Sequence, residues 1–281
     1  MSYLQVILMA IVQGLSEFLP ISSSAHLVFT SRLYTLITGT PVEHNTQEVF
    51  TDIILHFGTL IAVLIFYRKE LIEILKSLFL AIKTRDFSTT NAKLGLYIIL
   101  GTVITVVIAY PLYDIANYLV FSPFAVGVLL TFTGSFLIFS EYVSRNIFEK
   151  ENHISLKNSI MIAIAQGLAA LPGFSRSGLT ISTGLILGLD RNTAARYSFL
   201  LSIPIIFGAS LLFPFLKMDT TEIVNSDFML LTVGAIVSGL VGYFCIKYFI
   251  KFVSKFSLTF FGVYCLIVGF IMTALFYFVK G

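Results

Sequence analysis

Long apolar stretches recur along this chain, and six of them are long enough to cross a lipid bilayer as helices. A bilayer core of about 30 Å takes roughly 20 helical residues. The six stretches lie at 48–67, 94–113, 121–140, 193–216, 227–249 and 256–279. This pattern predicts an all-α integral membrane protein with six transmembrane helices.

The segment from 69 to 85 follows a different pattern. Its apolar positions recur at helical spacing, but Glu70, Glu73, Lys76 and Lys83 lie among them. A helix with one apolar and one charged side is typical of a membrane surface. The segment is therefore predicted to lie at the interface and not to span the bilayer.

Two further apolar regions, 3–39 and 159–190, are interrupted by polar turns. The first contains LPISSSAH at 19–26, and the second contains LPGFSRSGLT at 171–180. Each half is too short to cross a bilayer comfortably, and irregular backbone at membrane depth must be enclosed by protein or line a wet cavity. Both regions are predicted to be re-entrant helical hairpins, which return to the side from which they start.

The basic residues test this arrangement, because cytoplasmic loops carry an excess of Lys and Arg. If neither hairpin crosses, the six spans alternate, and one side of the membrane collects Arg68, Lys69, Lys76, Lys83, Arg85, Lys93, Arg145, Lys150, Lys157, Arg191, Arg196, Lys247, Lys251 and Lys255. The other side holds Arg32, Lys217 and Lys280. The first side is predicted to be cytoplasmic, which leaves both termini outside. Counting either hairpin as a full crossing would scatter the basic loops over both faces.

The two interrupted regions resemble each other. AIVQGLSEFLPISSS at 10–24 and AIAQGLAALPGFSRS at 163–177 share an AIxQGL opening, a Leu-Pro step and a serine-rich turn. In the predicted topology they enter from opposite sides, so the chain reads as one membrane domain, 1–281, with inverted repeats at about 1–140 and 158–281. Chance similarity between apolar segments is the alternative.

Composition agrees with a membrane protein and excludes several other classes. Hydrophobic residues make up 57% of the chain and charged residues 12%, against about one quarter charged in soluble domains. The net charge of +3 is small and the cations are scattered, which does not indicate nucleic-acid binding. Cys245 and Cys265 lie in apolar runs without metal-ligand spacing. No Lys or Arg precedes Arg32, which argues against a cleaved signal peptide.

The first hairpin carries residues that are suited to catalysis. Gln13 and Glu17 lie four apart on one helix face, directly before a turn with Ser22, Ser23 and His26. A carboxylate in hydrocarbon is costly, which makes Glu17 a functional candidate. Serine, histidine and glutamate together can serve as nucleophile, base and orienting group. The alternative for Glu17 is a structural tie to a hydroxyl or a helix N-terminus.

The second hairpin carries the features of an anion site. Arg176 is the one cation in its motif and is flanked by Ser175, Ser177 and Gly178. A buried guanidinium favours a bidentate anion, and the N-terminus of a new helix favours phosphate. Alternatively, the small residues allow close helix packing while Arg176 pairs with Glu17. Asp52 and His56 in the first span are weaker candidates, for which a structural role is as plausible.

Together these motifs resemble those of the undecaprenyl-diphosphate phosphatase family, which is linked to bacitracin resistance. The resemblance covers the whole chain: Gln13 and Glu17 match a Glu/Gln-x-x-x-Glu motif, 20–26 a Pro-x-Ser-Ser-x-x-His motif, and 172–180 a Pro-Gly-x-Ser-Arg-Ser-x-x-Thr motif. Members of that family have six spans and two re-entrant hairpins, release inorganic phosphate from the carrier lipid at the outer face, and use a divalent cation.

The resemblance implies a polyprenyl diphosphate substrate within the bilayer and Mg²⁺ or Ca²⁺ held by Glu17. Many members carry Glu at the position of Gln13 and Gly at the position of Ala25, so Glu17 is left as the main carboxylate. A homodimer is left open.

We therefore hypothesise that Ser23 attacks the terminal phosphorus, with His26 as base and then acid and Glu17 positioning the metal or the nucleophile. His26 is the alternative nucleophile. Arg176 would stabilise the developing charge. The expected substrate-binding residues are Gln13, Ser22, Gly173, Ser175, Ser177, Gly178 and Thr180.

Two other classes of protein compete with this enzyme. Inverted repeats with broken helices also build membrane transporters and flippases, which makes a carrier of polyprenyl phosphate or another anion the main rival. A carrier needs Arg176 but has no need of His26 as a proton shuttle, so the complete set of residues favours the enzyme. A non-catalytic scaffold would leave the buried Arg and Glu with no purpose beyond pairing.

Overall fold

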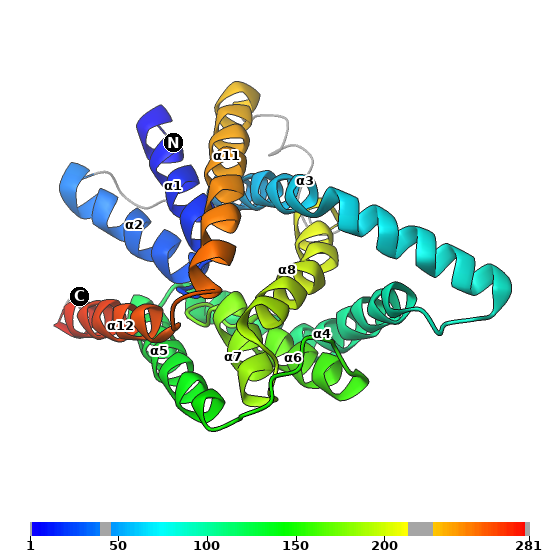
Figure 1. Ribbon diagram of the computed structural model, residues 1–281. Helices are drawn as coiled ribbons and strands as arrows, with labels where there is room; N and C mark the ends of the chain where they lie inside the picture. Colours follow the sequence, from blue (N-terminus) through cyan, green and yellow to red (C-terminus); the bar gives the residue numbers. More distant parts are fainter. Residues whose placement is uncertain (1, 40–45, 213–226, 279–281) are drawn as a thin grey trace.

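The computed structural model describes residues 2–39, 46–212 and 227–278 (Figure 1). Within these ranges the chain forms ten α-helices and one short π-helix, and no strand. Six of the helices are long and apolar enough to cross a membrane. The predicted all-α membrane class with six candidate spans is confirmed.

The six long helices overlap the predicted spans. They are α3 (Thr46–Thr84), α4 (Thr90–Val120), α5 (Pro123–Arg145), α8 (Arg191–Phe207) with its π-helical continuation η1 (Gly208–Leu212), α11 (Phe228–Val253) and α12 (Thr259–Phe278). Of these, α5, α11 and α12 begin one to three residues later than predicted. The end of the predicted span 193–216, position 279, Lys217 and Lys280 lie outside the described residues.

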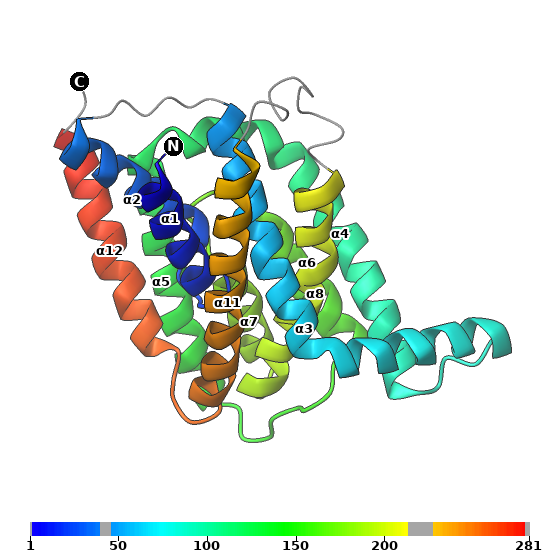
Figure 2. The ribbon, with the colours of Figure 1, turned by 90° about the horizontal axis from the view of Figure 1, so that it is seen from above.

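The first span and the segment predicted at 69–85 form one continuous helix, α3. No proline interrupts this stretch, and backbone hydrogen bonding continues through the charged residues because they are good helix formers. The second half of α3 projects sideways from the other helices together with the start of α4 (Figures 1 and 2). Its position at the membrane interface stays a prediction.

Four short helices occupy the two interrupted regions. They are α1 (Tyr3–Ser16) and α2 (Ser23–Thr38) in the first, and α6 (Leu156–Leu168) and α7 (Arg176–Ile186) in the second. Each break falls on the predicted motif. At the first break Ser22 has φ 68° and caps α2 by accepting from the Ala25 N–H at 3.3 Å, and at the second Gly173 has φ 104°. A left-handed residue ends the helical path, and the serine cap starts the next helix.

Small residues bring the last span close to α5. A Cβ on Gly134 would come within 2.6 Å of the Gly262 carbonyl oxygen, and one on Gly269 within 2.8 Å of the Gly127 carbonyl oxygen. Neither position has room for a side chain, so the backbones of α5 and α12 pack directly against each other. This contact fixes α12 beside the first interrupted region.

The interior of the bundle is aromatic next to the first break. Phe18 and Phe199 of α8 are fully buried and meet edge to face, with ring centroids 5.5 Å apart. Phe249 of α11 lies against Phe199 at 5.9 Å. These rings hold the backbone that follows α1, including its neighbour Glu17, against the long helices.

Candidate active site

Glu17 is the centre of a buried cluster of polar side chains. It follows the last turn of α1 and is 7% exposed. Its Oε1 atom accepts from Arg176 Nη2 at 2.6 Å, and its Oε2 atom accepts from Gln13 Nε2 and from Ser23 Oγ, both at 2.9 Å. The carboxylate therefore joins the break after α1 to the start of α7, across 159 positions of sequence.

Two polar atoms of this cluster have no partner among the described residues. They are Nη1 of Arg176, a donor, and Oε1 of Gln13, an acceptor, and both are buried. Buried polar groups in proteins are almost always hydrogen-bonded, and each exception calls for an explanation. The free face of the guanidinium suits an anion, and the free amide oxygen suits a cation or a donor group.

The two interrupted regions touch at further points. The Gly173 N–H donates to Ser24 Oγ at 3.2 Å, and Ser177 Oγ donates to the Leu19 carbonyl oxygen at 2.9 Å. Together with the Glu17–Arg176 ion pair, these bonds bring the motifs at 19–26 and 171–180 into one site. The sequence predicted that the two hairpins share a site, and these contacts are consistent with that prediction.

The serines and threonine of the second motif mainly hold the backbone around Arg176. Ser175 caps α7 by accepting from the Gly178 N–H at 3.0 Å, and its hydroxyl lies 3.3 Å from that of Ser177. Thr180 donates to the Arg176 carbonyl oxygen at 2.7 Å and lies 2.6 Å from Ser198 Oγ. All three hydroxyl residues are buried. They fix the first turn of α7 and with it the position of the guanidinium.

The two ring nitrogens of His26 bond to groups other than the Glu17 carboxylate. Its Nδ1 atom lies 2.8 Å from the Ser22 carbonyl oxygen, and its Nε2 atom lies 2.7 Å from the Tyr264 hydroxyl of α12. The hydroxyl of Ser23 donates to Glu17 instead. The contact between Ser23 and His26 that the hypothesised mechanism needs is not among the bonds of the described residues, and it stays a prediction for the complex with substrate.

His56 of α3, a weaker candidate from the sequence, lies next to Glu17 at the centre of the cluster. Its Nε2 atom is 3.5 Å from Glu17 Oε2, on a carboxylate oxygen that also serves Gln13 and Ser23. Its Nδ1 atom meets the Asp52 carbonyl oxygen at 2.7 Å. In the sequence, the only sign that His56 could belong to the site was its position as an ionisable side chain inside a predicted span. The rotation of α3 that turns His56 inward is decided by packing.

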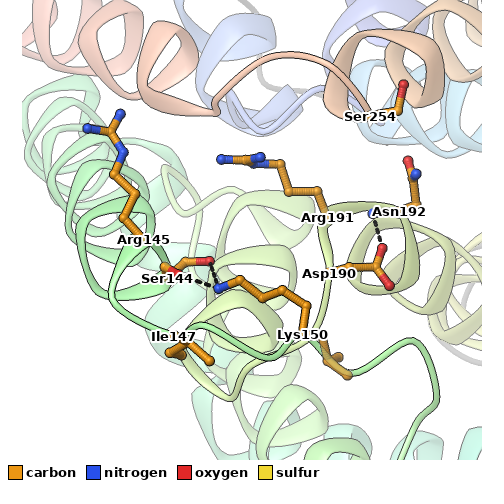
Figure 3. Close-up of a pocket in the computed structure, with 9 residues that line it drawn as sticks. Ser144, Arg145, Ile147, Lys150, Asp190, Arg191, Asn192 and Ser254 are labelled. Carbon is orange, nitrogen blue, oxygen red and sulfur yellow. Dashed lines mark hydrogen bonds between the residues drawn. The ribbon is translucent and has the colours of Figure 1, made fainter.

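A separate cavity of about 350 Å³ lies where α5 ends and α8 begins (Figure 3). None of its lining residues belongs to the Glu17 cluster. Three of its four charged lining residues are engaged: Arg191 donates to Glu141 at 2.9 and 2.6 Å, Lys150 donates to the Ser144 carbonyl oxygen and to its hydroxyl at 2.9 Å, and Asp190 caps α8. These bonds tie helix ends together, which accounts for the polarity of the cavity.

No group of three or more His, Cys, Asp or Glu side chains able to hold a metal ion occurs in the described part of the chain. In the cluster itself Glu17 is the one carboxylate, and Gln13 Oε1 is the free oxygen beside it. A hard divalent cation bound here would take its remaining ligands from the substrate or from water.

Comparison with known proteins assigns this arrangement to a family. Residues 6–271 match the family described as Bacitracin resistance protein BacA. The chain belongs to this family. It is also 38% identical to the undecaprenyl-diphosphatase of Halothermothrix orenii over 269 residues, covering 96% of both chains. Further relatives include the undecaprenyl-diphosphatase of Methanosphaera stadtmanae, 37% identical over 95% of this chain and 96% of the relative, and that of Desulfatibacillum aliphaticivorans, 38% identical over 96% and 97%.

Proposed function

We propose that this BacA-family chain is an undecaprenyl-diphosphatase, which hydrolyses a membrane-bound polyprenyl diphosphate to the monophosphate and inorganic phosphate. Its full-length relatives carry that name. The observation that carries the proposal is the buried Glu17–Arg176 pair, because the guanidinium keeps one unpartnered donor and the same carboxylate also accepts from the Ser23 hydroxyl. The product monophosphate is the form of the lipid carrier that can be reloaded for cell-envelope glycan synthesis.

Arg176 binds the diphosphate through the free face of its guanidinium, while Glu17 orients the hydroxyl of Ser23. Ser23 Oγ forms a bond to the terminal phosphorus, the bond from that phosphorus to the bridging oxygen breaks, and the polyprenyl phosphate leaves. His26 takes the serine proton and passes it to the leaving group. Water then attacks the phosphoserine, which releases inorganic phosphate and restores Ser23. Arg176 stabilises the charge on the transferring phosphoryl group.

A divalent cation, Mg²⁺ or Ca²⁺, fits beside these groups. Glu17 and the free Oε1 of Gln13 are oxygen ligands of the kind that both ions prefer. Such a cation neutralises negative charge on the diphosphate and polarises its phosphoryl oxygens. Since the chain supplies only two of these ligands, we expect the cation to bind together with the substrate.

Phosphate release by the purified protein in detergent micelles tests the enzyme against the transporter or flippase. Micelles do not separate two aqueous compartments, so transport cannot take place in them. A carrier would therefore release no inorganic phosphate from the lipid. We expect release from undecaprenyl diphosphate, a drop to background with excess chelator, and recovery on adding Mg²⁺ or Ca²⁺. The His26→Ala protein should lose most of the activity, and the exposed His153→Ala serves as its control.

A folded protein that binds the lipid but releases no phosphate would contradict the enzyme and favour the carrier. If phosphate release were undiminished in the presence of chelator, only the proposed requirement for a divalent cation would be contradicted, and the enzyme would stand.

We further propose that both interrupted regions are re-entrant hairpins of an inverted repeat. Two contacts support this. Ser2 at the start of α1 lies 3.0 Å from the Tyr34 hydroxyl near the end of α2, and Glu151, which precedes α6, shares backbone bonds of 2.9 Å with Gly188 and Asp190, which follow α7. Each pair of helices thus returns to the place where it starts.

The packing of the repeated glycines also supports an inverted repeat. Gly14 and Gly167 stand at matching positions of the AIxQGL motif. A Cβ on Gly14 would meet Val241 of α11 at 2.7 Å, and a Cβ on Gly167 would meet Ile108 of α4 at 2.6 Å. Because α4 and α11 occupy corresponding places in the two repeats, the matching glycines pack against matching helices.

We propose that the site opens to the outer face and that both termini lie outside. The start of α1 and the end of α12 lie at one end of the bundle, and the connections from α5 to α6 and from α11 to α12 lie at the opposite end (Figure 2). In the predicted alternation of the spans, most Lys and Arg residues belong to that second end, which the charge bias of membrane proteins makes cytoplasmic.

Single cysteines and a membrane-impermeant thiol reagent test this topology in intact cells. The natural Cys245 and Cys265 are buried, so background labelling should be low. We expect Ser122→Cys to react from outside, and Asn152→Cys and Asn192→Cys, on either side of the second hairpin, to react only after the cells are opened. Reaction of just one of the last two in intact cells would mean that α6 and α7 together cross the membrane.

A further inference from the structure

The ring of His26 is held by a tyrosine that lies 238 positions away in the sequence. The Tyr264 hydroxyl is 2.7 Å from His26 Nε2, and the two rings are nearly parallel, at an interplanar angle of 9° with centroids 5.6 Å apart. We propose that Tyr264 is a positioning residue for His26, which holds the ring in one orientation while the Ser22 carbonyl selects Nε2 as the basic nitrogen. The inference rests on the proposed role of His26 in phosphate release.

The two hydrogen bonds of His26 decide which nitrogen carries the proton. A backbone carbonyl oxygen can only accept, so the bond of 2.8 Å to the Ser22 carbonyl requires a proton on Nδ1. In the neutral ring Nε2 then presents its lone pair, and the Tyr264 hydroxyl donates to it. The base atom is thereby the nitrogen that points toward α12.

The backbone at Ser22 contributes to this arrangement. Ser22 has φ 68° and ψ 100°, and it is the N-cap of α2. The same residue therefore starts the helix through its side chain, which accepts from the Ala25 N–H, and fixes His26 through its carbonyl oxygen. With Nδ1 fixed by the backbone, the remaining freedom of the ring is controlled by Tyr264.

Tyr264 sits on a well-anchored part of α12. Its neighbour Cys265 is fully buried and donates from Sγ to the Pro20 carbonyl oxygen at 3.5 Å. Two residues before Tyr264, the Gly262 backbone packs directly on Gly134 of α5. A side chain set on rigid, packed elements can hold a catalytic group in position more firmly than one on a loop.

A phenol can serve His26 in both of its protonation states. It donates to Nε2 when the ring is neutral. Because Nε2 has one lone pair, the phenol hydrogen turns away from Nε2 as the serine proton arrives, and the phenol oxygen then accepts from Nε2–H. His26 can thus act as base and then as acid without losing its support. An unsupported ring would populate other orientations and lower the fraction of productive encounters.

A double-mutant cycle tests the coupling, with phosphate release from undecaprenyl diphosphate in detergent as the assay. Tyr264→Phe keeps the ring and removes only the hydroxyl. We expect it to lower kcat by about 10-fold, the size of one lost hydrogen bond to a catalytic group, with KM nearly unchanged. In the His26→Ala background the same change should cost nothing further, because coupled residues are non-additive. Tyr277→Phe, the same change in an exposed tyrosine of α12, should match the parent.

The nitrogen-15 NMR spectrum of histidine-labelled protein gives a second readout that needs no activity. His26 signals, assigned by their loss in His26→Ala, should show the Nδ1–H tautomer in the parent and a changed Nε2 shift in Tyr264→Phe. An unchanged Nε2 shift, parental kcat in Tyr264→Phe, or an equal loss in both backgrounds would overturn the proposal. If the parent releases no phosphate while the NMR result holds, the proposed function has failed and the positioning of His26 has not.

Discussion

Replacing Arg176 by alanine is expected to lower kcat/KM for phosphate release by about 10³-fold, the lower range for an arginine that stabilises phosphoryl transfer. The guanidinium offers one nitrogen to Glu17 at 2.6 Å and keeps a second buried donor free. Both the ground state and the transition state of a diphosphate need that donor, so kcat should fall and KM should rise. Release of phosphate from undecaprenyl diphosphate in detergent measures both.

Arg176→Lys should be nearly as impaired as the alanine variant. A lysine ammonium is a point charge and cannot serve the Glu17 carboxylate and the substrate in the fixed directions of a planar guanidinium. Arg196→Lys is the matched control, because Arg196 also pairs with a carboxylate, Glu70, at 2.6 Å but outside the site. Parental kinetics in Arg176→Ala would show that Arg176 does not bind the substrate. Parental kinetics in Arg176→Lys would show that only its positive charge is needed.

The Glu17→Gln variant is expected to lose about 10²- to 10³-fold in kcat, more than one ordinary hydrogen bond, because several contacts fail together. The carboxylate accepts from Arg176, Gln13 and Ser23, whereas an amide accepts at one oxygen only. The guanidinium is then left buried beside a neutral group, and the serine hydroxyl loses its fixed direction. The measurement is single-turnover phosphate release, compared with Glu70→Gln as a control.

Thermal unfolding in the same detergent separates the two causes of an activity loss in Glu17→Gln. A folded, lipid-binding variant with low kcat supports an active-site role. A variant that retains kcat but unfolds at a lower temperature would show that the Glu17–Arg176 pair is structural, which is the alternative that the sequence left open.

Several features of the fold follow from local sequence. The six apolar stretches, the two breaks and the new helix at Arg176 were all predicted, because hydrophobic length, proline, glycine and serine caps act over a few residues. The start of α2 at Ser23 was not predicted, because Ser23 and His26 were both expected to lie in the turn. The length of α3 was not predicted. The charged residues at 69–85 indicated a membrane interface instead of a span, but they favour helix as well as the preceding residues do, so the helix continues.

The candidate site was predictable in its composition and less so in its contacts. The motifs named Glu17, Ser23, His26 and Arg176, since buried charges and serine-rich turns are rare in apolar helices. The pattern of charges also allowed the Glu17–Arg176 pairing, because a buried cation and a buried anion stabilise each other. The direction in which His26 points could not be read from its spacing to Ser23.

By itself the sequence determined the membrane class, the number of candidate spans and the positions of the helix breaks, and it predicted that the two motifs share one site. Only the tertiary structure decided that His56 of α3 approaches Glu17 and that Tyr264 of α12 holds His26. The physical reason is that local preferences fix where helices begin and end, whereas the rotation of one helix against another depends on close packing over the whole interface. Glycine contacts such as Gly134 with Gly262 set that rotation, and no periodicity within a single helix specifies its partner.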